Sequence, residues 1–326
     1  MLLEVRHLTR YHYASNVRES VMELWMQPQK SGRQRLVSFD LELDPPAQLF
    51  SYADAFGNAV YHFDVPQPHD QLSIIASATV ETQTPDPLPD ALDMGEWDRL
   101  RSEQVRGENF DFLRHHGFCI ETEALLHFIT EMDLDRLRAI DPLNAVRQLS
   151  ETLYQAFAYD PQATDADSPI DIALASRRGV CQDFAHIMIA ICRRWGIPAR
   201  YVSGYLFTDR ESGDRSDPEA THAWVEVFLP STRWIGIDPT NNVLAGERHI
   251  AAAIGRDYGD VPPSRGVYKG DSESQLAVGV SVRRARSAQV EPEFIRLAKP
   301  SFSLNGRRRP VPGSLGYDQQ QQQQQQ

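Results

Sequence analysis

The sequence has few cysteines, and those it has cannot form a disulfide framework. Cys119, Cys181 and Cys192 are an odd number at uneven spacings, so at least one thiol is free. On a helix, the interval between the last two corresponds to a rise of about 16 Å, which is too long for a disulfide. Free thiols fit a reducing compartment, and we expect a cytoplasmic protein.

Basic residues and long apolar runs are also scarce. The 33 Lys and Arg residues face 45 Asp and Glu residues, for a net charge of -12. Nonspecific binding to nucleic acid relies on Lys and Arg that neutralise phosphates, so we expect no nucleic-acid partner. No run approaches the roughly 20 apolar residues of a membrane-spanning helix, and Glu4, Arg6 and His7 interrupt the first apolar stretch. We therefore expect no membrane partner, no membrane span and no secretory signal.

Alternating hydrophobicity dominates the first part of the chain. Apolar and polar residues alternate in runs at 5–13, 37–43, 59–65 and 72–80, which is typical of half-buried strands. The segment Asp54-Ala55-Phe56-Gly57-Asn58 suits a hairpin turn between two of these runs. We predict an all-β, sandwich-like domain over residues 1–85. The prolines and aspartates that crowd residues 84–90 indicate a boundary, and we expect a linker over residues 86–110.

Helical periodicity follows the linker. Asp141 and Pro142 have the residue types of a helix N-cap and first helical position. The apolar stripe of that helix comprises Leu143, Val146, Leu149, Leu153 and Phe157. A second helix is predicted from Cys181 to Trp195, with Gly196 as its C-terminal stop.

Strand-like runs come after these helices, at residues 199–207, 222–229 and 234–237, and the alternation at residues 276–282 predicts one more strand. Helices followed by mostly antiparallel strands indicate an α+β core, which we place at residues 111–285. We expect residues 286–326 to form a basic, partly disordered tail that includes Arg307-Arg308-Arg309 and a glutamine run from Gln319. The charged loop at residues 209–219 could border a substrate channel.

Three short segments carry the chemistry: Gly179-Val180-Cys181-Gln182-Asp183, Thr221-His222-Ala223-Trp224 and Ile237-Asp238-Pro239-Thr240. A thiol at a helix start, followed by a histidine and an aspartate on successive strands, is the set that cysteine-based acyl transfer requires. A helix N-terminus and a nearby imidazolium both favour the thiolate, which is the nucleophile. The same helix start would direct the backbone N–H of Cys181 at an oxyanion.

Strand geometry relates the second segment to the third. If a tight loop pairs Leu229 with Arg233, Asp238 lies opposite Trp224 and diagonal to His222 on the same face. Diagonal neighbours are roughly 7–8 Å apart at the backbone, so a carboxylate can reach the imidazole. This register therefore permits the hydrogen bond that would orient a catalytic base.

Other residues near these segments have simpler interpretations. His186 follows Cys181 by five positions, about 140° around a helix, so we expect it to make a structural hydrogen bond away from the thiol. A carboxylate at Asp183 favours the helix dipole. Trp224 shares a face with His222 and is a candidate wall of a substrate cleft, although a purely buried strand tryptophan is equally consistent.

The sequence resembles the bacterial transglutaminase-like proteins, which include candidate cysteine proteases. The resemblance spans residues 1 to about 285 and rests on residues 176–186, 196–205, 221–227 and 238–241, together with Phe56-Gly57-Asn58 in the N-terminal region. It implies a papain-like, transglutaminase-like core in which Cys181, His222 and Asp238 form a catalytic triad.

The predicted activity is cysteine-dependent acyl transfer on amide bonds of peptides or proteins, through a thioester acyl-enzyme. Hydrolysis, as by a protease or amidase, and transglutaminase-type transfer to an amine both stay open, as does the oligomeric state. No cofactor is expected. The alternatives are a non-catalytic peptide-binding module on the same scaffold, and a zinc site of Cys181, His222, Asp238 and His186. Zinc is disfavoured because His186 points away and no closely spaced ligand pair is present.

Overall fold

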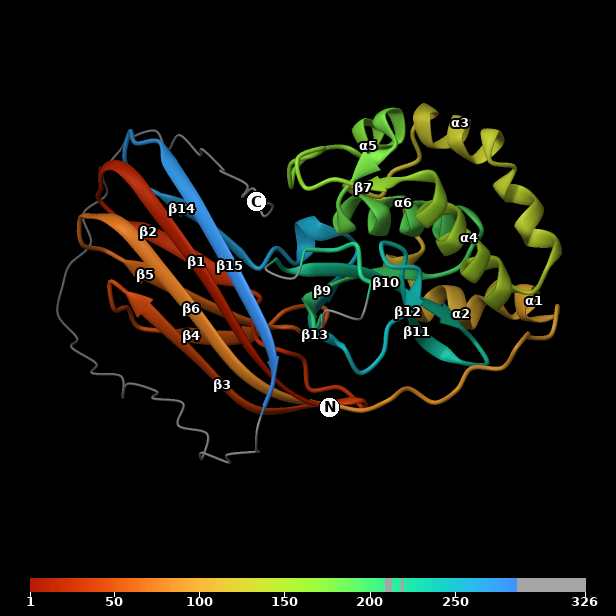
Figure 1. Ribbon diagram of the computed structural model, residues 1–326, viewed down its shortest axis with the longest axis horizontal. Helices are drawn as coiled ribbons and strands as arrows, with labels where there is room; N and C mark the ends of the chain where they lie inside the picture. Colours follow the sequence, from red (N-terminus) through yellow and green to blue (C-terminus); the bar gives the residue numbers. More distant parts are fainter. Residues whose placement is uncertain (209–212, 218–219, 286–326) are drawn as a thin grey trace.

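The computed structural model describes residues 1–208, 213–217 and 220–285, which form a β-sandwich beside a unit of helices and sheet (Figure 1). The sandwich strands are β1 (Leu2–Val17), β2 (Ser20–Leu24), β3 (Gln34–Asp44), β4 (Phe50–Ala53), β5 (Ala59–Val65), β6 (His69–Thr82), β14 (Ser264–Tyr268) and β15 (Ser274–Arg284). The helices of the second unit are α1 (Glu96–Leu100), α2 (Glu103–Glu108), α3 (Glu123–Glu131), α4 (Pro142–Ala156), α5 (Ile170–Ser176) and α6 (Cys181–Arg194). Its strands are β7 (Ala158–Tyr159), β8 (Arg178–Gly179), β9 (Ala199–Leu206), β10 (His222–Leu229), β11 (Arg233–Asp238), β12 (Val243–Leu244) and β13 (His249–Gly255). Three short 3₁₀ helices are η1 (Phe110–Phe112), η2 (Leu134–Ala139) and η3 (Tyr258–Asp260).

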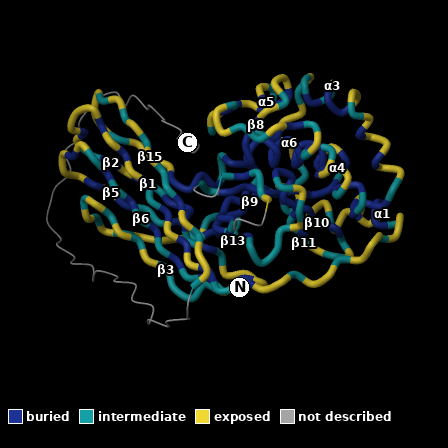
Figure 2. Tube along the Cα trace, viewed as in Figure 1, coloured by how far each residue is buried: buried dark blue, intermediate teal, exposed yellow. Residues whose placement is uncertain are grey.

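Two four-stranded sheets make the sandwich, in the orders β15-β1-β6-β3 and β14-β2-β5-β4. Their inward side chains, among them Tyr11, Leu24, Phe63 and Ile74, form one buried cluster. Burial alternates along β1 and β6, as Figure 2 shows, because successive side chains point to opposite faces. The predicted N-terminal β region is therefore confirmed, and β4 and β5 flank the predicted hairpin turn, with Gly57 at φ 81°.

The last two strands return to this sandwich. β15 pairs antiparallel with β1, and β14 pairs antiparallel with β2. Our prediction had assigned these segments to the core at residues 111–285. The alternation of residues 276–282 identified a strand, but its partner is the open edge of β1, more than 250 residues away in sequence.

The predicted linker also differs from the structure. Residues 86–110 include α1 and α2, and Trp97 and Leu100 of α1 are buried in the core of the second unit. The predicted tail at residues 286–326, including Arg307-Arg308-Arg309 and the glutamine run, lies outside the described residues. Residues 209–212 and 218–219 of the predicted channel loop also lie outside them.

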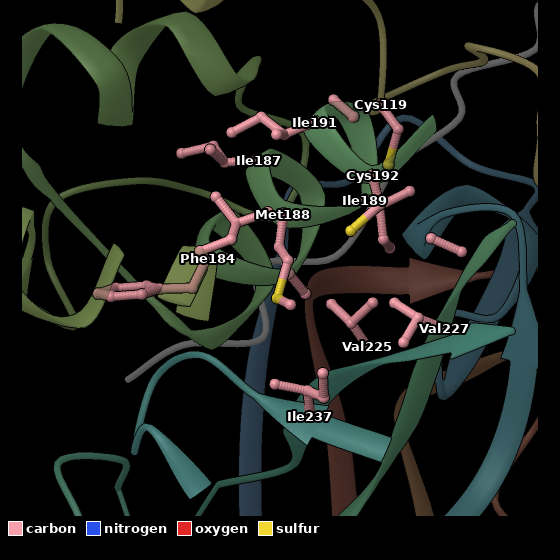
Figure 3. Close-up of a cluster of buried hydrophobic side chains, with 14 of the residues drawn as sticks. Cys119, Phe184, Ile187, Met188, Ile189, Ile191, Cys192, Val225, Val227 and Ile237 are labelled. Carbon is pink, nitrogen blue, oxygen red and sulfur yellow. The ribbon is translucent and has the colours of Figure 1, made fainter. Parts of the chain in front are cut away.

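The second unit packs helices on a five-stranded sheet of order β12-β11-β10-β9-β13. Helix α6 is almost wholly buried, and its apolar side chains lie over Val225, Val227 and Ile237 of β10 and β11 (Figure 3). Both predicted helices are present. The Asp141 side chain caps α4 by accepting from the backbone N–H groups of Leu143 and Asn144. None of the helices in the described ranges is long and apolar enough to cross a membrane.

Side-chain amides from the sandwich side of the molecule bind the free edge of β13. The Asn58 amide accepts from the backbone N–H of Ile254 at 2.8 Å and donates to its carbonyl at 2.8 Å. The Gln34 amide makes the same pair of bonds with Ala251, at 2.9 Å and 2.8 Å. These amides replace the backbone of a missing neighbour strand, so the sandwich completes the edge of the other sheet.

We expect Asn58→Ala to lower the free energy of unfolding by about 1–3 kcal/mol, because the buried Ile254 N–H and carbonyl lose their partners. Urea unfolding of the full chain measures this change. The matched control is Asn16→Ala on the exposed part of β1, which should change stability by less than about 0.5 kcal/mol. Equal stability of the two variants would contradict the role given to Asn58.

Candidate active site

Cys181 is the first residue of α6, and a compact turn sets its position. Strands β7 and β8 pair in parallel just before the helix, and Val180 is extended at φ -114° and ψ 174°. The Asp183 carboxylate accepts from the Val180 backbone N–H at 2.9 Å and from the Thr164 hydroxyl at 2.5 Å. A Cβ on Gly179 would lie 2.7 Å from that carboxylate, so only glycine permits this close approach.

Asp183 therefore caps the helix start, in line with the dipole role predicted for it. It is almost fully buried, and burial raises its pKa to about 6, even though its two hydrogen bonds act in the opposite direction. The resulting turn leaves the Cys181 side chain at the positive end of the helix dipole.

The β10–β11 hairpin has the register that the sequence predicted. Leu229 pairs with Arg233 and Val225 pairs with Ile237, so Asp238 lies one step beyond the last paired residue, opposite Trp224. His222 and Asp238 meet on the same face, with 2.7 Å between Nε2 and the carboxylate Oδ2. The predicted orienting hydrogen bond is therefore present.

Asp238 is fully buried and accepts five hydrogen bonds. Its Oδ2 accepts from His222 at 2.7 Å, from the Asn241 side chain at 2.8 Å and from His249 Nε2 at 3.2 Å. Its Oδ1 accepts from the backbone N–H groups of Thr240 at 3.0 Å and Asn241 at 3.2 Å. Burial would raise its pKa, but the charge of His222 and these bonds hold the pKa well below its usual range, so the carboxylate is ionised.

The charge state of His222 is determined mainly by the adjacent carboxylate of Asp238. Burial alone would lower the pKa of His222, but the charge and hydrogen bond of Asp238 raise it to about 10, and the neighbouring Cys181 side chain acts in the same direction. The other ring nitrogen, Nδ1, is buried and makes no hydrogen bond within the described part of the chain. His222 thus bonds Asp238 through Nε2 and leaves Nδ1 without a nitrogen or oxygen partner, while the Cys181 side chain also interacts with the ring.

Two tyrosines also lie within electrostatic reach of the thiol. Burial raises the pKa of both Tyr159 and Tyr201, and the charge of Cys181 raises each of them further. The Tyr159 hydroxyl accepts from the backbone N–H of Asp217 at 3.3 Å. No pattern in the sequence pointed to Tyr159, because it lies 22 residues before Cys181 and comes near it through the β7–β8 pairing.

The other two cysteines differ from Cys181. All three are free and belong to the same buried cluster, but Cys119 and Cys192 have no exposed surface, whereas Cys181 at the helix start keeps 5%. Burial raises the pKa of both thiols, that of Cys192 to about 12, so neither forms a thiolate near neutral pH.

His186 occupies the position expected for a structural histidine. It is fully buried, its Nε2 accepts from the backbone N–H of Tyr258 at 3.1 Å, and its ring stacks on Phe118. Burial, and then the nearby Arg193, lower its pKa to about 3, so the ring is neutral. The structural hydrogen bond predicted for His186 is confirmed.

Trp224 is buried and contacts both imidazoles of the site. Its ring stacks with that of His222 at 6.1 Å between centroids and meets that of His249 edge-on at 5.2 Å. It also lines a cavity of about 230 Å³ whose walls include Arg200 and Trp234. A role for Trp224 in binding substrate stays a prediction.

His222, Asp238 and His249 are the described residues whose ligand atoms, all within 4.8 Å of one another, could hold a metal ion. His186, the fourth ligand in the zinc alternative, is not one of them. His249 Nδ1 accepts from the Gly246 backbone N–H, so its Nε2 carries the proton and donates to Asp238. The hydrogen bonds of Asp238 and His249 are therefore satisfied without a metal, which disfavours the zinc alternative.

The sequence analysis missed the contribution of His249 to this site. His249 starts β13, whose sequence His249-Ile250-Ala251-Ala252-Ala253-Ile254-Gly255 shows no clear alternation because it is buried on both faces. Asn241 was part of the resemblance, but no role was assigned to it. Its position three residues after Asp238, typical of an Asx-type turn, was an available signal.

Comparisons with known proteins identify the family and the fold. Residues 3–81 match the family described as the bacterial transglutaminase-like N-terminal region, and residues 135–239 match the transglutaminase-like superfamily. An uncharacterized protein of Mycobacterium tuberculosis is 35% identical over 288 residues, covering 85% of this chain and 90% of that protein. An uncharacterized protein of Mycobacterium leprae is 31% identical over 284 residues, covering 86% of this chain and 98% of that one.

A crystal structure described as a candidate cysteine protease from Cytophaga hutchinsonii has the same fold. Its TM-score is 0.66 at 21% identity, covering 91% of this chain and 95% of that one. A shorter match, 33% identical over 133 residues, is to a protein-glutamine gamma-glutamyltransferase of Pseudomonas aeruginosa, covering 36% of this chain and 19% of that protein. The fold is thus that of a transglutaminase-like core preceded by a β region. The chain belongs to the bacterial transglutaminase-like family.

The buried His222–Asp238 pair predicts a specific pH dependence of stability. Because folding raises the pKa of His222, its contribution to the free energy of unfolding is fully present below about pH 6.5 and is lost as the pH rises toward 10. The lowered pKa of Asp238 means that its contribution is lost as pH falls below about 3.8. In urea unfolding, the stability difference between wild type and His222→Gln should be largest near pH 5 and should shrink steadily at pH 7 and 9.

His186→Gln is the control for this experiment, because the contribution of His186 to stability depends on pH in the opposite direction. Because folding lowers the pKa of His186, this imidazole binds a proton in the unfolded state at pH values where it stays neutral in the folded state. Its favourable contribution should therefore fall as pH drops below about 6.5 and stay constant above. Parallel pH dependence for the two variants would contradict the charge states assigned here.

Proposed function

We propose that this protein is a cysteine-dependent acyl transferase that acts on amide bonds of peptides or proteins. The observation that carries the proposal is the arrangement of His222, whose Nε2 is bonded to a buried, ionised Asp238 while its unpaired Nδ1 remains for the thiol at the start of α6. A buried imidazole held between a carboxylate and a thiol is the arrangement that nucleophilic catalysis by cysteine needs.

The residues have separate roles in the reaction. His222 takes the proton of Cys181, and the imidazolium that results is stabilised by Asp238. The thiolate attacks the amide carbonyl, and the oxyanion is bound by the backbone N–H of Cys181 at the helix start. When the C–N bond breaks, His222 returns the proton to the leaving amine or ammonia, and a thioester on Cys181 remains. An acceptor then attacks the thioester, His222 removes its proton, and Cys181 leaves as the thiolate.

The acceptor decides which reaction is completed. Water gives a protease or amidase, whereas a primary amine gives transglutaminase-type transfer. The Pseudomonas aeruginosa relative named as a protein-glutamine gamma-glutamyltransferase supports the glutamine side-chain amide as the first acyl donor to test. We propose a peptide or protein as the substrate, and a cytoplasmic location remains a proposal that rests on the three free thiols.

The proposal is tested by mass spectrometry of glutamine-containing peptide libraries incubated with the full chain, with and without a primary amine. Backbone cleavage, conversion of an amide to an acid, and addition of the amine with loss of ammonia give distinct products. We expect Cys181→Ala to lower the rate by more than about 10³-fold, because removal of a nucleophile leaves only binding and oxyanion contacts.

Cys192→Ala is the matched control, since it removes a buried thiol in the same helix and should retain activity. Activity should also persist in the presence of a chelator and be abolished by iodoacetamide. A Cys181→Ala protein with wild-type activity would rule out the proposal, and loss of activity in chelator would favour the zinc alternative. Peptide binding without turnover in either protein would favour the non-catalytic module.

A further inference from the structure

We propose that His249 is a positioning residue, a neutral imidazole that donates from Nε2 to Asp238 and holds this carboxylate in the orientation that serves His222. The inference rests on the proposed function, because it concerns the same site. It adds a second histidine, from a different strand, to the machinery that orients the catalytic base.

The hydrogen bonds of His249 fix its tautomer. The backbone N–H of Gly246 donates to Nδ1 at 3.2 Å, so Nδ1 must carry a lone pair. In a neutral imidazole the proton then resides on Nε2, which lies 3.2 Å from Asp238 Oδ2. Since an ionised carboxylate only accepts hydrogen bonds, His249 is the donor.

The groups around His249 keep it uncharged. Its pKa is lowered, first by complete burial and then by the positive charges of His222 and Arg248, while Asp238 acts in the opposite direction. Arg248 is itself paired with Asp214 at 2.6 Å. Because His222 holds the positive charge next to Asp238, a second charged imidazole there would be unfavourable. Two histidines thus contact one carboxylate oxygen in different charge states.

Packing gives the His249 contact a fixed direction. Its ring meets Trp224 edge-on, Trp224 also stacks with His222, and the two imidazole centroids lie 6.1 Å apart, so one indole contacts both imidazoles. Backbone pairing of His249 with Leu206 holds the start of β13 against β9. Without the His249 donor, the backbone N–H groups of Thr240 and Asn241 still hold Oδ1, but the direction of Oδ2 would depend on His222 and Asn241 alone. The alignment of His222 with Cys181 would then be less well defined.

The test measures the rate of Cys181 alkylation by iodoacetamide between pH 5 and 9 on the full chain, which needs no knowledge of the substrate. Cys119 and Cys192 have no exposed surface, whereas Cys181 keeps 5% exposure, and Cys181→Ala gives the background rate. His249→Phe keeps a planar ring without the donor, whereas His249→Gln places an amide N–H where Nε2 was. His186→Phe is the matched control, because it makes the same exchange at a buried histidine outside the site.

We expect His249→Phe to slow alkylation at pH 6 about tenfold, the factor that one hydrogen bond to a charged group supports, and to move the acid limb of the profile upward by about one pH unit. His249→Gln should stay within about threefold of wild type. His186→Phe should leave the profile unchanged. Thermal melting of each variant establishes that it is folded.

Two results would overturn the role of His249. One is a folded His249→Phe protein with the wild-type profile, and the other is a His249→Gln protein as slow as His249→Phe. If His249→Phe does not fold, His249→Asn replaces it, because the shorter amide cannot reach Asp238 and should show the same loss relative to Gln. If Cys181 of the wild type is alkylated at pH 6 no faster than an ordinary exposed cysteine, the proposed function fails. If wild-type alkylation is fast and His249→Phe does not slow it, only the role of His249 is refuted.

Discussion

The burial of one ionised carboxylate, Asp238, is the constraint around which this protein is organised. A lone carboxylate with no solvent exposure would be strongly destabilising, so its neighbours must supply donors and charge. Five hydrogen bonds do so, from the His222 and His249 rings, the Thr240 and Asn241 backbone and the Asn241 side chain. The donors come from three segments that are separated in sequence. The site can therefore form only when strands β10, β11 and β13 occupy their places in the sheet.

The position of β13, and so the formation of the site, also depends on the β-sandwich. Strand β13 is an edge strand, and an edge strand leaves backbone groups unpaired. The amides of Asn58 and Gln34 satisfy those groups at Ile254 and Ala251 of β13. The N-terminal unit thus supports the strand that carries His249, although it contributes no donor to the carboxylate itself. Since β14 and β15 close the sandwich from the other end of the chain, the two units fold as parts of one connected structure.

The sequence predicted those features that depend on local geometry. The hairpin register of Leu229 with Arg233 followed from strand alternation and a short loop, and it brought His222 and Asp238 together. The direction of His186 followed from helical periodicity. What could not be predicted depends on contacts distant in sequence. The pattern of β15 revealed a strand without its partner β1, and His249 starts a strand whose two buried faces hide any alternation.

Asn241 links the carboxylate to the described segment at residues 213–217. Its amide nitrogen donates to Asp238 at 2.8 Å and to the Ser216 hydroxyl at 3.1 Å, while its amide oxygen accepts from the backbone N–H of Arg215 at 2.7 Å. Asp217, two residues further along, donates from its backbone to Tyr159 beside the thiol. The described segment at residues 213–217 is therefore bonded at both ends of the Cys181–His222–Asp238 arrangement. The Asn241 side chain is thus bonded to residues 215 and 216 on one side and to Asp238 on the other, so one amide links this segment to the carboxylate that orients His222.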